Sequence, residues 1–259
     1  MADDGPLVVE RRGSVGVWTL ARPDVKNALD STFTALSRAL LAARGDPTLR
    51  AVVLTGRGGT FASGGDLREL RTATTVEDAG RLCDVGRAVC DAIAGLPVPV
   101  IAALPGPAIG GGAELAVACD LRVADARATL CFKHARMAVT TAWGILPRLV
   151  ALVGHGAASR LLLTAEEIGA GEALRLGLVQ AVTEDGGCVE RAVSWALDVA
   201  SGAPRATADL KTLLREAIDP AAAAGVRDRE RELFIAAWTG ADHQDAVEAF
   251  FARRPPRWR

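Results

Sequence analysis

The sequence predicts an α/β fold, and three observations carry that prediction. Apolar runs with strand character alternate with helical segments through roughly the first two-thirds of the 259-residue chain. Helical segments dominate the remainder. Glycine-rich turns join strands to helices at 56–59, 64–65 and 110–112. Together these features indicate a parallel α/β core with a helical C-terminal part.

The expected strands are short apolar runs bounded by turn residues. Two N-terminal strands meet at a turn formed by Arg12 and Gly13. The continuous apolar run 50–55 is typical of a strand buried on both faces, which places the sheet inside the fold. The predicted strands lie at 7–10, 15–20, 50–55, 98–103, 120–124, 129–132 and directly after 177–179.

The expected helices follow these strands. The helix over 76–96 ends where Pro97 and Pro99 interrupt it, since proline cannot continue a helix. The predicted helices lie at 30–43, from 67 onward, 76–96, 113–118, 147–154, 156–163, 170–176, 189–202, 207–218, 221–238 and 242–251. We find no internal repeat and no low-complexity linker. We therefore expect one core over 1–200 and a helical region over 201–259.

Composition excludes several classes of partner. The net charge of −1 provides no overall field to attract nucleic acid or a membrane surface. The acidic N-terminus lacks an apolar signal core and no run is long enough to span a membrane, so we expect a cytoplasmic protein. The cysteines form no C-x-x-C pair and are expected to be reduced thiols, with no disulfide and no metal site. They are Cys83, Cys90, Cys119, Cys131 and Cys188.

Two loops share one design that suits the binding of an anion. In 61–67 and 109–115, glycines follow a strand-like segment and precede a helix whose start carries an acid, Asp66 or Glu114. Glycines let a ligand approach main-chain N–H groups closely, and the N-terminus of a helix favours negative charge. Two such loops in one chain can direct two N–H donors at one oxygen, which is an oxyanion hole.

These loops resemble the paired signatures of the crotonase superfamily, the enoyl-CoA hydratase/isomerase family. Further matching segments are Arg22-Pro23 with Asn27-Ala28-Leu29, Cys119-Asp120, and 173–179. The resemblance extends from about residue 7 to the last helix. It implies a crotonase-like ββα spiral core, with a helical C-terminal region over 201–259 that builds a homotrimer or a dimer of trimers.

The resemblance also implies an acyl-CoA thioester as substrate, with coenzyme A as the carrier of the acyl group and no separate cofactor. The main-chain N–H groups of Gly65 and Gly111 would bind the thioester oxygen. Arg22 and Arg68 are further candidates for contacts with the coenzyme A phosphates, and Lys211 and the basic tail 253–257 are candidates for contacts with the coenzyme A of a neighbouring subunit. The residues expected to hold coenzyme A are Lys26, Ala28, Ala62, Gly64, Gly65, Asp66, Leu67 and Gly111.

Two positions decide the reaction within this family. Hydratases carry a glutamate two residues after the glycine triplet and a second glutamate twenty residues later. Here the first position holds Glu114, but the second holds His134. An imidazole can deliver a proton near neutral pH without a large pKa shift. We therefore predict that Glu114 and His134 are catalytic.

The segments 132–137 and 142–144 resemble the alkylmalonyl-CoA decarboxylase branch of the superfamily. Loss of CO₂ generates the enolate without a base, and only an oxyanion hole and a proton donor are then required. The preferred prediction is decarboxylation of a small 2-alkylmalonyl-CoA, with His134 as proton donor, Glu114 positioning it and Trp143 as a wall of the acyl pocket. Two alternatives remain open: hydration of an enoyl-CoA by Glu114, and a catalytically silent acyl-CoA-binding subunit. An acyl-carrier protein with the same pantetheine arm is an alternative carrier.

Overall fold

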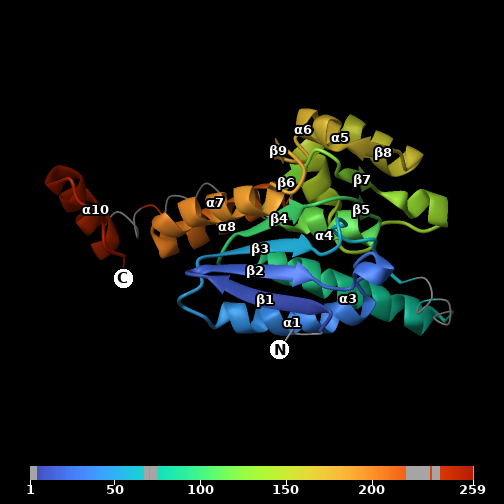
Figure 1. Ribbon diagram of the computed structural model, residues 1–259, viewed down its shortest axis with the longest axis horizontal. Coiled ribbons are helices and arrows are strands. Elements are labelled where there is room, and N and C mark those ends of the chain that lie inside the picture. The colour runs from blue at the N-terminus through green and yellow to red at the C-terminus, as the bar shows by residue number, and fades with distance from the viewer. Residues whose placement is uncertain (1–4, 67–69, 71–74, 220–233, 235–239, 259) are drawn as a thin grey trace.

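The predicted α/β fold is confirmed by a computed structural model that describes residues 5–66, 70, 75–219, 234 and 240–258 (Figure 1). The strands are β1 Leu7–Arg12, β2 Val15–Leu20, β3 Ala51–Gly56, β4 Val100–Leu104, β5 Ala108–Ile109, β6 Leu121–Asp125, β7 Thr129–Cys131, β8 Glu167–Gly169 and β9 Ala181–Thr183. The helices are α1 Asp30–Arg44, α3 Val76–Ala94, α4 Gly111–Ala118, α5 Leu146–Thr164, α6 Ala170–Arg175, α7 Cys188–Ser201, α8 Pro204–Ala217 and α10 Ala241–Ala252. Two short 3₁₀ helices, η1 Pro23–Val25 and η2 Lys133–Met137, accompany them.

The main sheet has the strand order β1-β2-β3-β4-β6-β9. Only β1 and β2 pair antiparallel, and every other neighbour in this sheet is parallel. All residues of β3 and β4 are buried, as expected for central parallel strands covered on both faces.

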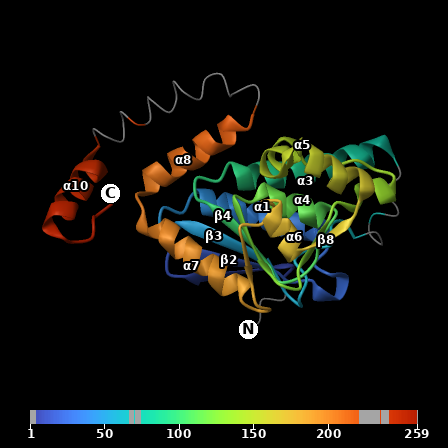
Figure 2. The same cartoon turned by 90° about the horizontal axis from the view of Figure 1, so that it is seen from above.

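The two faces of the main sheet form separate cores because side chains alternate along each strand. Val53, Ile101 and Ala103 pack on the face covered by α7. Val52, Leu54 and Ala102 belong to the larger core on the opposite face, which α1, α3 and α4 cover. Figure 2 shows α7 on one side of the strands and α1, α3 and α4 on the other. The helix α4, which begins within the glycine triplet, is therefore held within the larger core.

A second, smaller sheet has the order β5-β7-β8. The sequence patterns missed β5 and β8 because strands of two and three residues carry no periodicity. The two helices predicted over 147–154 and 156–163 join into α5, with Gly154 in a left-handed conformation at φ +75° where they meet. The helix predicted from residue 113 begins at Gly111, so two of the triplet glycines belong to it.

The C-terminal part is helical, as predicted. Helices α8 and α10 extend to the side of the molecule away from the small sheet (Figures 1 and 2). The predicted helix over 221–238 lies outside the described residues, apart from Phe234. The helix predicted from Leu67 also falls mostly outside them. The division into 1–200 and 201–259 stays a prediction.

Candidate active site

Main-chain hydrogen bonds hold the two glycine loops side by side. The Phe61 N–H donates to the Pro107 carbonyl at 3.0 Å, and the Ile109 N–H donates to the Ala62 carbonyl at 2.9 Å. Ala62 and Ala108 form a parallel β-bridge. A Cβ atom at position 112 would overlap the Ala62 carbonyl, so a glycine is needed for this approach. The two loops therefore meet, as an oxyanion hole requires.

The glycines expected to bind the thioester oxygen lie at this junction. Gly64 has φ +84°, and a Cβ on it would lie 2.9 Å from the Gly111 nitrogen. This contact places Gly65, the next residue of the first loop, beside the start of α4. Gly111 is the first residue of α4, where N–H groups have no carbonyl one turn earlier to bind. Gly110 caps the helix with φ +56°.

Glu114 and His134 lie in contact inside the protein. The Glu114 side chain is 2% exposed, and its Oε1 lies 2.8 Å from His134 Nε2. The Trp143 main-chain N–H donates to Glu114 Oε2 at 3.1 Å. The other imidazole nitrogen, His134 Nδ1, is buried and has no hydrogen-bond partner within the described part of the chain. The pair thus contains one buried polar atom to which no described residue supplies a hydrogen bond.

The local backbone brings His134 to α4. The segment η2 begins after the buried Phe132 and ends at Ala138, which takes a left-handed conformation at φ +56°. The Val139 N–H then donates to the His134 carbonyl at 3.2 Å. This turn reverses the chain and leads it to Trp143. The same short segment therefore supplies both groups that hydrogen-bond to Glu114.

The residues expected to hold coenzyme A surround the first loop. Lys26 is exposed beside it, with φ +53°. Ala28 is buried, and its carbonyl accepts hydrogen bonds from Arg22 and Thr32. The Gly64 carbonyl accepts from the Leu29 N–H at 2.8 Å. Leu67 and Arg68 lie outside the described residues, and the roles of all these residues toward coenzyme A stay predictions.

Arg22 and Asp66 form an ion pair, with 3.5 Å between Nη2 and Oδ2. Asp66 is buried, and the Arg22 side chain is 20% exposed. The buried Asn27, which the sequence indicated only as part of a matching segment, adds a second support. Its side-chain N–H groups donate to the carbonyls of Arg57 and Thr60, while its carbonyl oxygen accepts from the Arg22 main-chain N–H. These bonds fix the shape of the first loop.

The prediction that Lys211 contacts coenzyme A is wrong. Its side chain is 7% exposed, and its ammonium group donates to the carbonyls of Ile93 and Val98. It also pairs with Asp120 at 2.7 Å. Burial lowers the pKa of Lys211, although Asp120 opposes this effect. Lys211 is thus a structural link between α8 and the end of α3. In the basic tail, Arg254 pairs with Asp245.

Arg122 is a second buried cation, 1% exposed, which the sequence patterns did not single out. It donates to the carbonyls of Ala116 and Cys119 at 3.1 and 2.8 Å, and to that of Leu178 at 2.6 Å. Burial lowers the pKa of its guanidinium to about 10. Cations favour the C-terminal ends of helices, where carbonyls lack partners. Arg122 therefore stabilises the C-terminal end of α4.

The fold and site define an α/β protein in which two glycine loops meet at a helix N-terminus beside a buried carboxylate and imidazole. Comparison with known proteins gives the family, because the enoyl-CoA hydratase/isomerase profile matches residues 10–259. The chain therefore belongs to this family, the crotonase superfamily, whose enzymes act on acyl-CoA. Among the helices of the described ranges, none combines the length and apolar character needed to cross a membrane.

Relatives and solved structures agree with this assignment. The short-chain-enoyl-CoA hydratase of Clostridium acetobutylicum is 35% identical over 96% of this chain and 95% of its own. The crystal structure of an enoyl-CoA hydratase from Polaromonas sp. JS666 matches with a TM-score of 0.93 and 31% identity, over 98% of this chain and all of that one. An enoyl-CoA hydratase from Bacillus anthracis matches at 0.92 and 30%, over 98% of both chains. These names support the superfamily and not its decarboxylase branch.

Proposed function

We propose that this protein is an enoyl-CoA hydratase in which Glu114 and His134 together replace the usual pair of glutamates. The contact of 2.8 Å between Glu114 Oε1 and His134 Nε2 carries the proposal. The names of the relatives favour hydration over the decarboxylation that the sequence motifs predicted first. The proposed substrate is an enoyl thioester of coenzyme A.

The oxyanion hole would act on the thioester carbonyl. Water addition to the β-carbon of the double bond turns the thioester into an enolate, whose negative charge lies largely on the carbonyl oxygen. The N–H groups of Gly65 and Gly111, if directed at that oxygen, would stabilise this charge more than they stabilise the neutral carbonyl. Loss of one such donor typically costs about 3–4 kcal/mol of barrier. The α4 dipole adds to the same effect.

The Glu114–His134 pair would move the protons. In the starting state Glu114 is ionised and His134 is neutral, with its proton on Nε2 toward Glu114. As water attacks the β-carbon, His134 Nδ1 accepts the water proton and the Nε2 proton passes to Glu114 Oε1. Glu114 then protonates the α-carbon of the enolate. One proton leaves water and one reaches carbon, so the pair returns to its original charge with the imidazole proton now on Nδ1. Exchange of this proton with solvent restores the starting tautomer for the next turnover.

Decarboxylation remains the second candidate because of one observation. His134 stands where the family's hydratases carry a second carboxylate, which leaves fewer negative charges to repel an anionic malonyl group. In that reaction the bond to the carboxylate breaks, CO₂ leaves, and its electron pair forms the enolate. The doubly protonated imidazole of His134 then supplies the proton to the α-carbon. The oxyanion hole is the same in both reactions.

One experiment separates the candidates. The purified protein is incubated with crotonyl-CoA and, separately, with ethylmalonyl-CoA, and the thioester products are followed by mass spectrometry. We expect 3-hydroxybutyryl-CoA from the first substrate and no butyryl-CoA from the second. Butyryl-CoA without hydration would support decarboxylation and contradict our proposal. Binding of both thioesters without turnover would indicate the catalytically silent subunit.

We also propose that α8 and α10 build a trimer or a dimer of trimers. Leu210 and Leu214 on α8 are 60% and 71% exposed, which leaves apolar surface available for a subunit contact. Light scattering coupled to size-exclusion chromatography measures the mass in solution. A monomer at micromolar concentration would contradict this assembly.

A further inference from the structure

The indole of Trp143 is fixed between three helices next to the oxyanion hole. Its six-membered ring lies against Gly111 and its five-membered ring against Gly86, so closely that a Cβ on either glycine would overlap it. Phe33 meets the indole edge-on, with ring centroids 5.2 Å apart and an interplanar angle of 83°. Contacts from α1, α3 and α4 therefore hold this side chain in one place.

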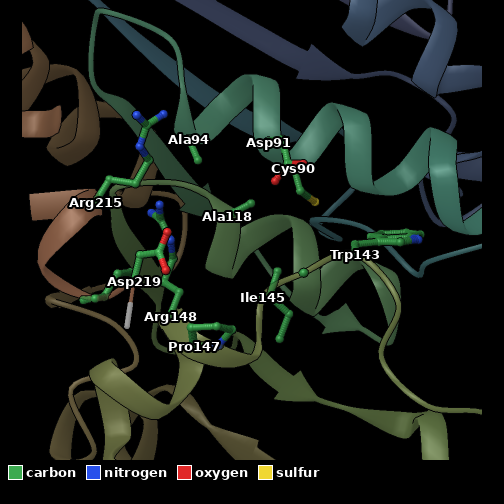
Figure 3. A pocket seen from close by; sticks show the side chains of 12 residues that line it. Cys90, Asp91, Ala94, Ala118, Trp143, Ile145, Pro147, Arg148, Arg215 and Asp219 are labelled. Carbon is green, nitrogen blue, oxygen red and sulfur yellow. The ribbon is translucent and has the colours of Figure 1, made fainter. Parts of the chain in front are cut away.

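A pocket of about 280 Å³ adjoins Trp143 and lies between α3, the C-terminal turn of α4, the start of α5 and the end of α8. Cys90 and Ala94 line it and follow Gly86 by one and two helical turns on the same face of α3. Ala118 lines it from the C-terminal turn of α4. In Figure 3, Trp143 lies at one end, with Cys90 and Ala118 between it and the charged far end. The pocket thus extends from the indole away from Gly111.

The lining changes character along this pocket. Near its middle, α3 contributes the small side chains of Cys90 and Ala94 together with the carboxylate of Asp91, and α4 contributes Ala118. Arg215 and Asp219 lie toward the end opposite Trp143 (Figure 3). Cys90, Ala94 and Ala118 therefore offer a strip of apolar surface to a hydrocarbon chain, with Asp91 beside Cys90 and further charged groups at the far end (Figure 3). An acyl chain that runs from Gly111 toward this surface meets the indole, because the six-membered ring lies against Gly111.

We infer that Trp143 sets the acyl-chain length, so that the enzyme accepts short chains and excludes longer ones from the pocket behind the indole. This inference rests on the proposed function, since it takes the thioester oxygen to bind at Gly65 and Gly111. A short acyl group such as crotonyl ends before the pocket. A longer chain meets the indole, whose position is fixed by Phe33 and by the two glycines.

The test compares crotonyl-CoA with trans-2-octenoyl-CoA by kcat/KM. We expect the wild type to prefer crotonyl-CoA and Trp143→Ala to raise the octenoyl-to-crotonyl ratio at least about tenfold, as opening a steric block does. Trp195→Ala, which removes an indole from α7, should leave the ratio within about twofold of wild type. An unchanged ratio in Trp143→Ala, or a wild-type preference for octenoyl-CoA, would overturn the inference.

Two further measurements keep the test independent of folding and of the chemistry. Trp143→Phe keeps an aromatic ring against Phe33 and should shift the ratio in the same direction by a smaller factor. Calorimetric binding of saturated butyryl-CoA and octanoyl-CoA should show the same change of preference in Trp143→Ala. If the binding preference shifts but no enoyl-CoA is hydrated, the proposed reaction is wrong and the chain-length inference stands. If hydration occurs and neither the kinetic ratio nor the binding preference shifts, the proposed reaction stands and the chain-length inference is wrong.

Discussion

Buried charged groups lie at both ends of α4, but the two ends differ in whether all the buried polar atoms have hydrogen-bond partners. At the C-terminal end, Arg122 donates to the carbonyls of Ala116 and Cys119, and Arg148 donates to Cys119 as well, at 3.3 Å. At the N-terminal end, Glu114 accepts two hydrogen bonds, but His134 Nδ1 has no partner in the described part of the chain. Among the described residues, the buried cation at the C-terminal end of α4 thus has its hydrogen-bond partners, whereas the Glu114–His134 pair at the N-terminal end has one polar atom without a partner.

The difference separates stability from function. A buried cation with all its donors satisfied stabilises the carbonyls that would otherwise be orphaned at a helix end. A buried polar atom without a partner costs free energy unless a ligand supplies the missing bond. We therefore expect substitutions at the C-terminal end of α4 to lower stability, and substitutions at its N-terminal end to lower turnover.

The largest expected effect falls on turnover at the N-terminal end. Glu114→Gln keeps an acceptor for the Trp143 N–H but removes the proton-transfer group, so kcat on crotonyl-CoA should fall by about 10³-fold. The melting temperature should stay within about 3 °C of wild type, because the side chain keeps its shape. Glu10→Gln, at an exposed position on β1, is the matched control. A Glu114→Gln rate within about threefold of wild type would show that Glu114 is not the acid/base.

The next effect falls on stability at the C-terminal end. Arg122→Met removes the donors to three main-chain carbonyls and should lower the free energy of unfolding by about 3–5 kcal/mol. Urea denaturation followed by circular dichroism measures this change. Activity per folded molecule should be retained. Arg81→Met, at an exposed site, should leave stability nearly unchanged, and equal effects of the two variants would contradict the assigned role of Arg122.

The smallest expected effect concerns the carboxylate of Asp125 at the N-terminus of α7, which contrasts with the carboxylate of Glu114 at the N-terminus of α4. Asp125, the last residue of β6, is buried against the N-terminus of α7, and burial by itself raises the pKa of its carboxyl group. Hydrogen bonds from the Gly186 and Cys188 N–H groups and from the Thr183 hydroxyl outweigh this, so the pKa lies below its ordinary 3.8. Its stabilising contribution is therefore present above the unfolded-state pKa and is lost as pH falls through the lower, folded-state value.

Asp125→Asn should consequently make the free energy of unfolding fall less steeply as the pH is lowered, without changing turnover of the folded protein. Urea unfolding at a series of pH values from about 6 to about 3 measures the slope. A slope as steep as that of wild type would show that Asp125 does not contribute to the acid sensitivity.

Much of the fold could be predicted because its central strands are continuous apolar runs and its helices have regular spacing. The short strands β5 and β8 could not, since pairing with β7 alone defines them. Gly65, Gly111, Glu114 and His134 could be selected from motifs and from a spacing of twenty residues. The Trp143 N–H on Glu114 could not, because a main-chain donor leaves no sequence signal.

Lys211 is a residue for which the sequence predicted a role that the structure contradicts. A lysine on an amphipathic helix is usually exposed, and the sequence therefore suggested a ligand contact. Its pairing with Asp120, which lies far away in the chain, buries it instead. Long-range pairing of this kind depends on how α8 packs against the end of α3, and no local pattern reports it.

The most direct test of the proposed role of the Glu114–His134 pair is the rate of crotonyl-CoA hydration by the His134→Ala variant. We predict a loss of at least about 100-fold in kcat, because the imidazole would carry the proton of the attacking water. Binding of butyryl-CoA, measured by calorimetry, should be nearly unchanged, and His155→Ala at an exposed position of α5 should behave as wild type. Hydration at the wild-type rate in His134→Ala would contradict the proton-transfer role of the Glu114–His134 pair.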